Sequence, residues 1–306
     1  MAGISTSMLL AAAAVREART DRTPPAQRNA AIARACLQRA GSGGDRLLRA
    51  VDTRPGRGLL RLLEAACLPG IGAHYTWRKR RIRRWAQQAC AEGVQQVLIL
   101  GAGFDGLAQA LLDQAPALRV FEVDREATLA IKQAALRALC LDDPRLRLCP
   151  GELGTVPLVR WLRGLPGFAP ELPTLIVAEG LLMYLPLDTA QALLRQLARA
   201  LPDARLIATA MALCHDGAPG FVRQRPWVRR WLGRRGEPFR WGATRQALPT
   251  LLGQGGVRMD GIADADDADD PDPAPGEWLF HGRLLHPDHS VAAASPHSRL
   301  RAAALP

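Results

Sequence analysis

Apolar and polar positions follow two different patterns along this chain of 306 residues. Up to about residue 92, apolar residues recur every three or four positions, which predicts helices. These helices are expected at 6–19, 27–40 and 75–91, with shorter pieces between 45 and 68. The Pro69-Gly70 pair interrupts the pattern, as expected for two strong helix breakers. The first ninety or so residues are therefore predicted to be helical.

Beyond residue 92, short apolar runs alternate with helical segments. A continuous run such as VLIL (97–100) is typical of a strand buried on both faces. The predicted strands are 94–100, 118–124, 145–150, 173–180, 204–211, 257–264 and 277–285, and the predicted helices are 107–115, 126–140, 188–200 and 244–252. Such alternation predicts a parallel α/β sheet. Only a short segment joins the last two strands, so they should pair antiparallel.

The prediction is an α/β fold with a mostly parallel, seven-stranded sheet, a terminal antiparallel hairpin and an N-terminal helical cap. We expect the helical region at 1–92, the sheet domain at 93–286 and a disordered tail at 287–306. No apolar run approaches the ~18 residues needed to span a bilayer. The apolar run at 8–15 lacks a basic leader and continues into charged residues, unlike a signal peptide. We therefore expect a cytoplasmic protein with no membrane partner.

Composition adds a net charge of +11. Lys79 and Lys132 are the two lysines, so 38 of the 40 basic residues are arginines. Two clusters stand out, WRKRRIRRW (77–85) and RQRPWVRRWLGRR (223–235). Both are typical of solvated helix faces, and the alternative is a track for nucleic-acid phosphates. The six cysteines show no C-x-x-C spacing and the acidic run before residue 277 lacks EF-hand spacing, so no metal site is predicted.

The stretch VLILGAGFDGLA (97–108) carries the candidate chemistry. Glycines at a strand-to-helix turn let a ligand approach the backbone closely. Asp124 closes the next predicted strand, where a carboxylate can accept hydrogen bonds from ribose hydroxyls. The pattern predicts an adenosine-type cofactor, with NAD as one candidate. Asp105 inside the loop would repel a pyrophosphate but not the sulfonium of S-adenosylmethionine, which favours the latter.

Three motifs together resemble the leucine carboxyl methyltransferase family, a group of class I S-adenosylmethionine-dependent O-methyltransferases. They are GAGFD (101–105), FEVD (121–124) and VAEGLLMYLP (177–186). The family also includes polyketide carboxyl methyltransferases and a wybutosine-tRNA branch, and the resemblance extends over about residues 70–285. It implies a Rossmann-like fold and an enzyme that forms a methyl ester on a carboxylate of a small molecule or peptide.

The resemblance also implies roles for single residues. Arg78 matches an arginine that grips the cofactor's carboxylate, and Glu179 would face its amino group or sulfonium. Asp124, or alternatively Glu122, would bind the ribose. Glu152 and its neighbour Leu153 match the pair that holds the adenine. The complete set of expected cofactor-binding residues is Arg78, Gly101, Gly103, Asp105, Glu122, Asp124, Glu152, Leu153 and Glu179.

On the substrate side, the resemblance implies a lining role for Tyr184. Arg240 is a further candidate, because an arginine near the mouth could attract an acidic substrate. Family members usually continue GAGFDTRAYRL, whereas this chain has GAGFDGLAQAL and lacks that tyrosine and arginine. A carboxylate acceptor is ionised at neutral pH and needs no base. His74 and His215 are isolated in the sequence, so no catalytic residue is predicted.

Three alternatives remain open at this stage. The arginine clusters are compatible with a tRNA-modifying methyltransferase. The altered residues after the glycine loop are compatible with a protein that binds S-adenosylmethionine without catalysis. The glycine pattern by itself is compatible with an NAD-dependent dehydrogenase. The sequence identifies neither the methyl acceptor nor the oligomeric state.

Overall fold

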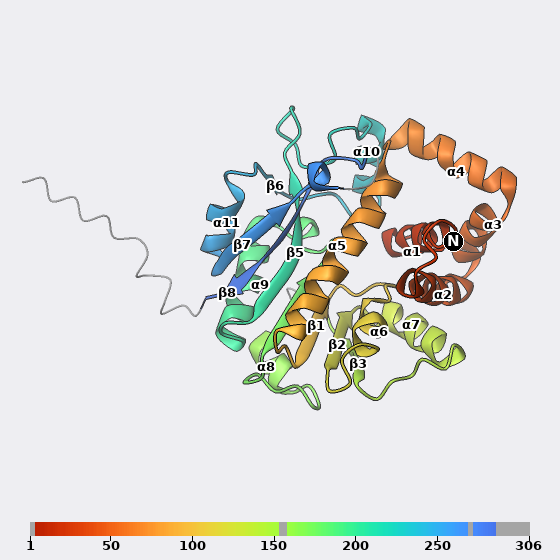
Figure 1. Ribbon diagram of the computed structural model, residues 1–306. Helices are drawn as coiled ribbons and strands as arrows, with labels where there is room; N and C mark the ends of the chain where they lie inside the picture. The colour runs from red at the N-terminus through yellow and green to blue at the C-terminus, as the bar shows by residue number, and fades with distance from the viewer. Residues whose placement is uncertain (1–3, 153–157, 269–271, 286–306) are drawn as a thin grey trace, which may run out of the picture.

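A computed structural model describes residues 4–152, 158–268 and 272–285, and it shows one sheet covered by helices (Figure 1). The strands are β1 (Gln96–Leu100), β2 (Arg119–Asp124), β3 (Leu146–Pro150), β4 (Thr174–Ala178), β5 (Arg205–Ala212), β6 (Gly242–Ala243), β7 (Val257–Ala263) and β8 (Glu277–Leu284). The helices are α1 (Thr6–Glu17), α2 (Pro24–Arg39), α3 (Ser42–Asp52), α4 (Arg54–Cys67), α5 (Ile71–Ala91), α6 (Leu107–Leu112), α7 (Glu126–Ala138), α8 (Leu158–Arg163), α9 (Leu187–Ala200), α10 (Pro226–Arg234) and α11 (Leu248–Gln254).

The strand order is β3-β2-β1-β4-β5-β8-β7. The first five strands in the chain run parallel, and β8 pairs antiparallel with both β5 and β7. The expected parallel sheet with a terminal antiparallel hairpin is therefore confirmed. The two-residue strand β6, which pairs with the end of β5, was not predicted, and neither was helix α8. Helix α10 lies within the basic cluster at 223–235, which we interpreted as a solvated helix face.

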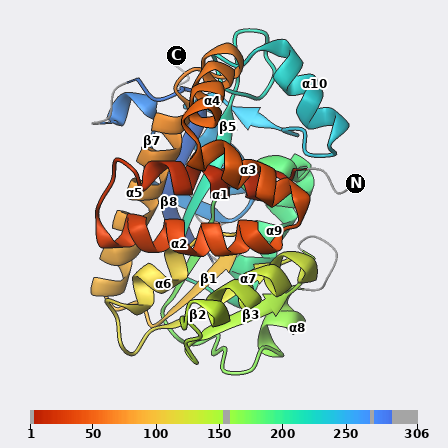
Figure 2. The same ribbon diagram turned by 90° about the vertical axis from the view of Figure 1, so that its right-hand side faces the viewer.

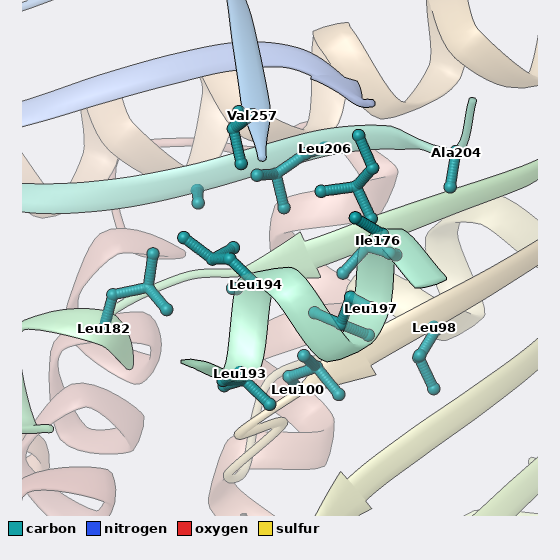
Figure 3. Close-up of a cluster of buried hydrophobic side chains, with 14 of the residues drawn as sticks. Leu98, Leu100, Ile176, Leu182, Leu193, Leu194, Leu197, Ala204, Leu206 and Val257 are labelled. Carbon is teal, nitrogen blue, oxygen red and sulfur yellow. The ribbon is translucent and has the colours of Figure 1, made fainter. Parts of the chain in front are cut away.

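Alternate residues of each central strand face opposite sides of the sheet, as the pleat requires. Leu98 and Leu100 point toward α8, α9 and α11, where leucines of α9 pack on them (Figure 3). Val97 and Ile99 point to the other face and pack with α5 and α6. Both faces of the sheet are covered, which explains the continuous apolar run of β1.

Helices α1, α2 and α3 form a separate apolar cluster beside the sheet. Their alanine-rich and leucine-rich faces pack on each other and on α7, and Phe104 of the glycine loop joins the same cluster. Figure 2 shows α1 and α2 crossing in front of the sheet above β1 and β2. The N-terminal helices are thus anchored next to the carboxyl ends of the central strands.

Helix α5 packs mainly on the sheet, although its Tyr75 belongs to the N-terminal cluster. Trp77, Ile82 and Ala86 are buried in the apolar layer that contacts β1, β2 and β4. The sheet core therefore extends upstream of the division we predicted at residue 92. None of the helices that the structure describes is both long and apolar enough to cross a membrane.

Candidate active site

The glycine loop turns sharply at the end of β1. Gly101 and Gly103 have φ angles of +72° and +51°, a region that favours glycine. The Gly101 amide donates to the Val123 carbonyl at 2.8 Å, and the Gly103 amide donates to Oδ2 of Asp124 at 2.8 Å. Asp124 therefore holds the loop against the end of β2.

A cavity of about 700 Å³ opens beside this loop. The carboxyl ends of β1, β2 and β4 form one wall, and α1, α4, α5 and α10 form the others. Ligand sites of parallel α/β sheets lie at this edge, because the loops there follow the strand ends. The predicted residues that line it are Arg78, Gly101, Gly103, Asp105, Asp124, Glu152, Glu179 and Tyr184.

Arg78 lies between two carboxylates in this cavity. Its Nε is 2.9 Å from Oε1 of Glu179, at the end of β4, and its Nη1 donates to Oε2 of Glu277 at 2.7 Å. The Arg78 side chain is 9% exposed, so both ion pairs are shielded from water. Burial alone would lower the pKa of Arg78, but Glu277 and Glu179 outweigh it and raise that pKa.

Lys79 forms a second ion-pair cluster next to Arg78. Its Nζ is 2.7 Å from Oδ2 of Asp105 and 2.8 Å from Glu179. Burial would raise the pKa of Asp105, but Lys79 holds it below its usual range. Sequence reasoning placed Lys79 in a solvated basic cluster. The only signal for its role was its position directly after Arg78.

His74 and Glu277 are two further cavity residues that the sequence did not predict. His74 Nε2 lies 2.7 Å from Oε2 of Glu277, and both side chains are 1% exposed. Burial favours the neutral form of Glu277, yet Arg78 and His74 lower its pKa to about 2. His74 lies on α5, one helical turn before Arg78, and Glu277 begins β8. Only the three-dimensional arrangement brings them together.

Glu122 lies away from the cavity. Its carboxylate is buried against Lys132 of α7, with Nζ at 2.6–2.7 Å from its two oxygens. Its side chain is 1% exposed and does not line the cavity. Burial raises the pKa of Glu122 although Lys132 opposes the shift. Asp124 is the remaining candidate for the ribose, and Glu122 is left out of the proposed site.

The other predicted residues have different surroundings. Tyr184 lines the cavity, and its ring packs 5.6 Å from that of Phe239. Arg240 is exposed and does not line the cavity; its amide donates to the Met183 carbonyl. Leu153 lies outside the residues that the structure describes. Arg240 therefore has no place in the substrate pocket that we describe.

One part of the cavity lining is mainly apolar. The side chains there come from the segment after β4, from β5 and from the region of α10. They include Met183, Tyr184, Met211, Phe221, Val228, Trp231 and Phe239. An apolar chamber of this kind suits a bulky apolar ligand.

Comparison with known proteins assigns this chain to a family. The sequence model for leucine carboxyl methyltransferase matches residues 9–198, more than half of the chain. A provisionally named S-adenosyl-L-methionine-dependent methyltransferase of Streptomyces avermitilis is 38% identical over 120 residues. That match covers 36% of this chain and 38% of the relative's own length.

Solved structures show the same fold. A provisionally named methyltransferase of Thermobifida fusca superimposes with a TM-score of 0.56 at 17% identity, covering 82% of this chain and 94% of that one. Magnesium protoporphyrin IX methyltransferase of Synechocystis, crystallised with SAH, gives a TM-score of 0.50 at 12% identity, covering 80% and 95%. The sheet and its covering helices are thus those of a class I methyltransferase.

Proposed function

We propose that this chain, which belongs to the leucine carboxyl methyltransferase family, is a methyltransferase that uses S-adenosylmethionine. The observation that carries the proposal is the charged cluster of Arg78, Lys79 and Glu179 beside the glycine loop. It offers opposite charges within one buried pocket, as a zwitterionic amino-acid group requires. The same family match supports the cofactor, because relatives of this chain are named for S-adenosyl-L-methionine.

The residues present fit such a cofactor. Asp124 stands at the end of β2 and lines the cavity, where a ribose would meet its carboxylate. Gly101 and Gly103 line the cavity with backbone alone, so a ligand can approach the loop closely at these two positions. Arg78 keeps Nη2 for a ligand carboxylate, since Nε and Nη1 are the atoms that face Glu179 and Glu277. Glu179 would attract the cofactor's positive charge.

When bound, S-adenosylmethionine supplies an activated methyl group, so the protein mainly positions the acceptor and excludes water. The apolar chamber around Phe221, Trp231 and Phe239 would desolvate the acceptor. We propose a carboxylate of a small molecule or peptide as the acceptor, as in other members of the family. Such a group is already ionised at neutral pH and needs no base.

A second candidate acceptor is a hydroxyl group, and one observation favours it. His74 lines the cavity with Nε2 bonded to Glu277, and its Nδ1 has no hydrogen-bond partner among the described residues. A phenol has a pKa near 10, so its methylation benefits from a general base. Methylation of a carboxylate gives an ester, which alkali cleaves. Methylation of a hydroxyl group gives an ether, which resists alkali.

Calorimetry with S-adenosylhomocysteine tests the cofactor assignment. We expect binding of S-adenosylhomocysteine and none of NAD. Arg78→Lys keeps the charge but loses the planar fork, so we expect at least tenfold weaker binding. Arg205→Lys, which changes an arginine paired with Glu92 outside the cavity, should leave binding unchanged. Equal affinities of both variants and the natural protein would remove Arg78 from the site.

Methyl transfer from a labelled donor then distinguishes the acceptors. Incubation with candidate acids and phenols should yield a labelled product, and its release by mild alkali identifies an ester. His74→Ala should retain ester formation but abolish ether formation. A chain that binds S-adenosylhomocysteine but transfers no methyl to any acceptor would support the reading of a binding protein without catalysis.

A further inference from the structure

Helix α4 has an apolar face that the rest of the described structure leaves largely exposed. None of its fourteen residues is buried. Leu59, Leu62 and Leu63 are 56%, 70% and 47% exposed, and their spacing places them on one side of the helix. Leu60 and Glu64 lie on the opposite side and line the cavity. About half or more of each of these three leucine side chains is therefore open to solvent.

More exposed apolar side chains lie next to this helix. Val222 is 48% exposed and Trp227, on α10, is 47% exposed. The Arg225 amide donates to the Cys67 carbonyl at 3.1 Å, which joins the start of α10 to the end of α4. Both views place α4 and α10 at the same end of the molecule (Figures 1 and 2). Large exposed apolar side chains are thus gathered rather than scattered.

The same surface is strongly basic. Residues 217–236 contain six arginines and no acidic residue. Two of these arginines pair with aspartates, whereas Arg225, Arg230 and Arg234 are exposed and have no ion pair within the described part of the chain. On α4, the single acid, Glu64, is paired with Arg16 at 2.7 Å. We call the surface formed by Arg225, Arg230 and Arg234 with Leu59, Leu62, Leu63, Val222 and Trp227 the α4–α10 face.

We propose that the α4–α10 face docks on an anionic lipid surface. Amphipathic helices that lie in a membrane interface combine leucine and tryptophan on one side with arginine beside them. Leucines on an exposed helix can enter a fluid acyl layer, while arginines reach the headgroups through their long side chains. A second copy of this chain would place the arginines against one another, so charge disfavours self-association through this face.

This proposal differs from our expectation of no membrane partner, which came from the absence of an apolar run long enough to span a bilayer. Docking on a surface requires no such run. The proposal also stands independently of the methyltransferase function, because none of the proposed cofactor-binding residues belongs to the α4–α10 face. The two can therefore succeed or fail separately.

Sedimentation with lipid vesicles tests the proposal. We expect the natural protein to sediment with vesicles of phosphatidylglycerol and phosphatidylcholine, and to remain in solution with phosphatidylcholine alone. Each arginine near an anionic surface contributes about a factor of five to partitioning, so Arg230→Ser/Arg234→Ser should lower partitioning about twenty-five-fold. Leu59→Ser/Leu62→Ser/Leu63→Ser should lower it at least tenfold. Added salt should also weaken binding.

The matched control is Arg160→Ser/Arg163→Ser. It removes two exposed arginines from α8, at the opposite end of the molecule, and should leave vesicle binding unchanged (Figure 2). A cooperative urea-unfolding transition like that of the natural protein verifies that each variant is folded. Absence of vesicle binding, or equal loss in all three variants, would overturn the proposal. A dimer in sedimentation velocity that the triple serine variant abolishes would instead assign this face to a second copy of the chain.

Discussion

Glu122 and Asp124 lie two residues apart on β2 and have different surroundings. Glu122 lies one pleat deeper, where α7 covers the strand and Lys132 neutralises it. Asp124 is half-buried at the strand end, bonded to the glycine loop. Two positions along one strand are thus enough to place Glu122 in a buried ion pair and Asp124 at the cavity.

Substitutions at these positions should separate the two roles. Lys132→Met leaves the buried Glu122 carboxylate unpaired, which should lower the free energy of unfolding by about 3–5 kcal/mol in urea denaturation. Glu122→Leu/Lys132→Met should recover most of that loss and bind S-adenosylhomocysteine normally. Asp124→Ala should instead weaken binding at least tenfold. Weakened binding in the double variant would return Glu122 to the cofactor site.

The Glu277 carboxylate makes the free energy of unfolding depend on pH. Its pKa lies near 2 in the folded protein because Arg78 and His74 outweigh the effect of burial. A depressed pKa stabilises the fold above the unfolded value, near 4.5, and this stabilisation is lost as the pH falls toward 2. The free energy of unfolding of the natural protein should therefore exceed that of Glu277→Gln by a few kcal/mol at pH 7.

The comparison across pH tests this linkage. Between about pH 5 and pH 3, the gap between the two proteins in urea denaturation should narrow, because the Glu277 carboxylate takes up a proton in the unfolded chain but stays charged in the folded one, and Glu277→Gln has no such carboxylate. A gap that stays constant over that interval would show that the Glu277 carboxylate is not held charged by Arg78 and His74.

Local sequence was sufficient for some of the site and not for the rest. Gly101 and Glu179 follow apolar strands in short motifs, so their location at a strand end could be predicted. Lys79, His74 and Glu277 have no such motif. Glu277 begins the last strand, and its proximity to α5 depends on where β8 joins the sheet. Contacts between residues about two hundred positions apart are not encoded in local patterns.

At the scale of elements, the basic residues of α5 are divided between the cavity and ion pairs or hydrogen bonds elsewhere in the protein. Arg78 and Lys79 face the cavity, Arg80 pairs with Asp21, and Arg81 donates to the Asp267 carbonyl. Arginines of this helix are thus directed to different partners instead of forming one continuous track. Within the cluster at 77–85, residues 78–81 are therefore engaged by the protein itself and do not form a phosphate-binding row.

The sequence pattern predicted the central strands well because β1 and β4 are buried along their whole length on both faces and read as apolar runs. It predicted helix α10 poorly, since the arginines of this helix conceal a short apolar side that contains one buried residue, Leu232. The two-residue strand β6 is too short for any periodicity. Secondary structure was therefore predicted most accurately for segments that are buried on both faces along their whole length.

Helices α4 and α9 have the same length and opposite burial. Both contain fourteen residues, but α9 buries six of them and α4 buries none. Because local opening is easiest where few apolar contacts are lost, backbone amides of α4 should exchange with deuterium at least tenfold faster than those of α9. Mass spectrometry of peptides from the two helices checks this. Equal protection would indicate that α4 is covered in solution.

At the scale of the whole molecule, the cavity joins two regions that the sequence presents as separate. Its lining comes from α1 in the N-terminal helices and from the glycine loop of the sheet. Gly106 of that loop donates its amide to the Asn29 side chain of α2 at 2.9 Å, which ties the two regions directly. A ligand in the cavity should therefore stabilise both regions together.

Ligand binding provides the test of this coupling. S-adenosylhomocysteine at about one hundred times its dissociation constant should add about 2.7 kcal/mol to the free energy of unfolding and raise the melting temperature by several degrees. Deuterium exchange should slow in α1 as well as in residues 101–105, because cavity-lining side chains of both would contact the ligand or be held in place by it. Protection confined to the glycine loop would mean that the N-terminal helices move independently of the sheet and do not close the site.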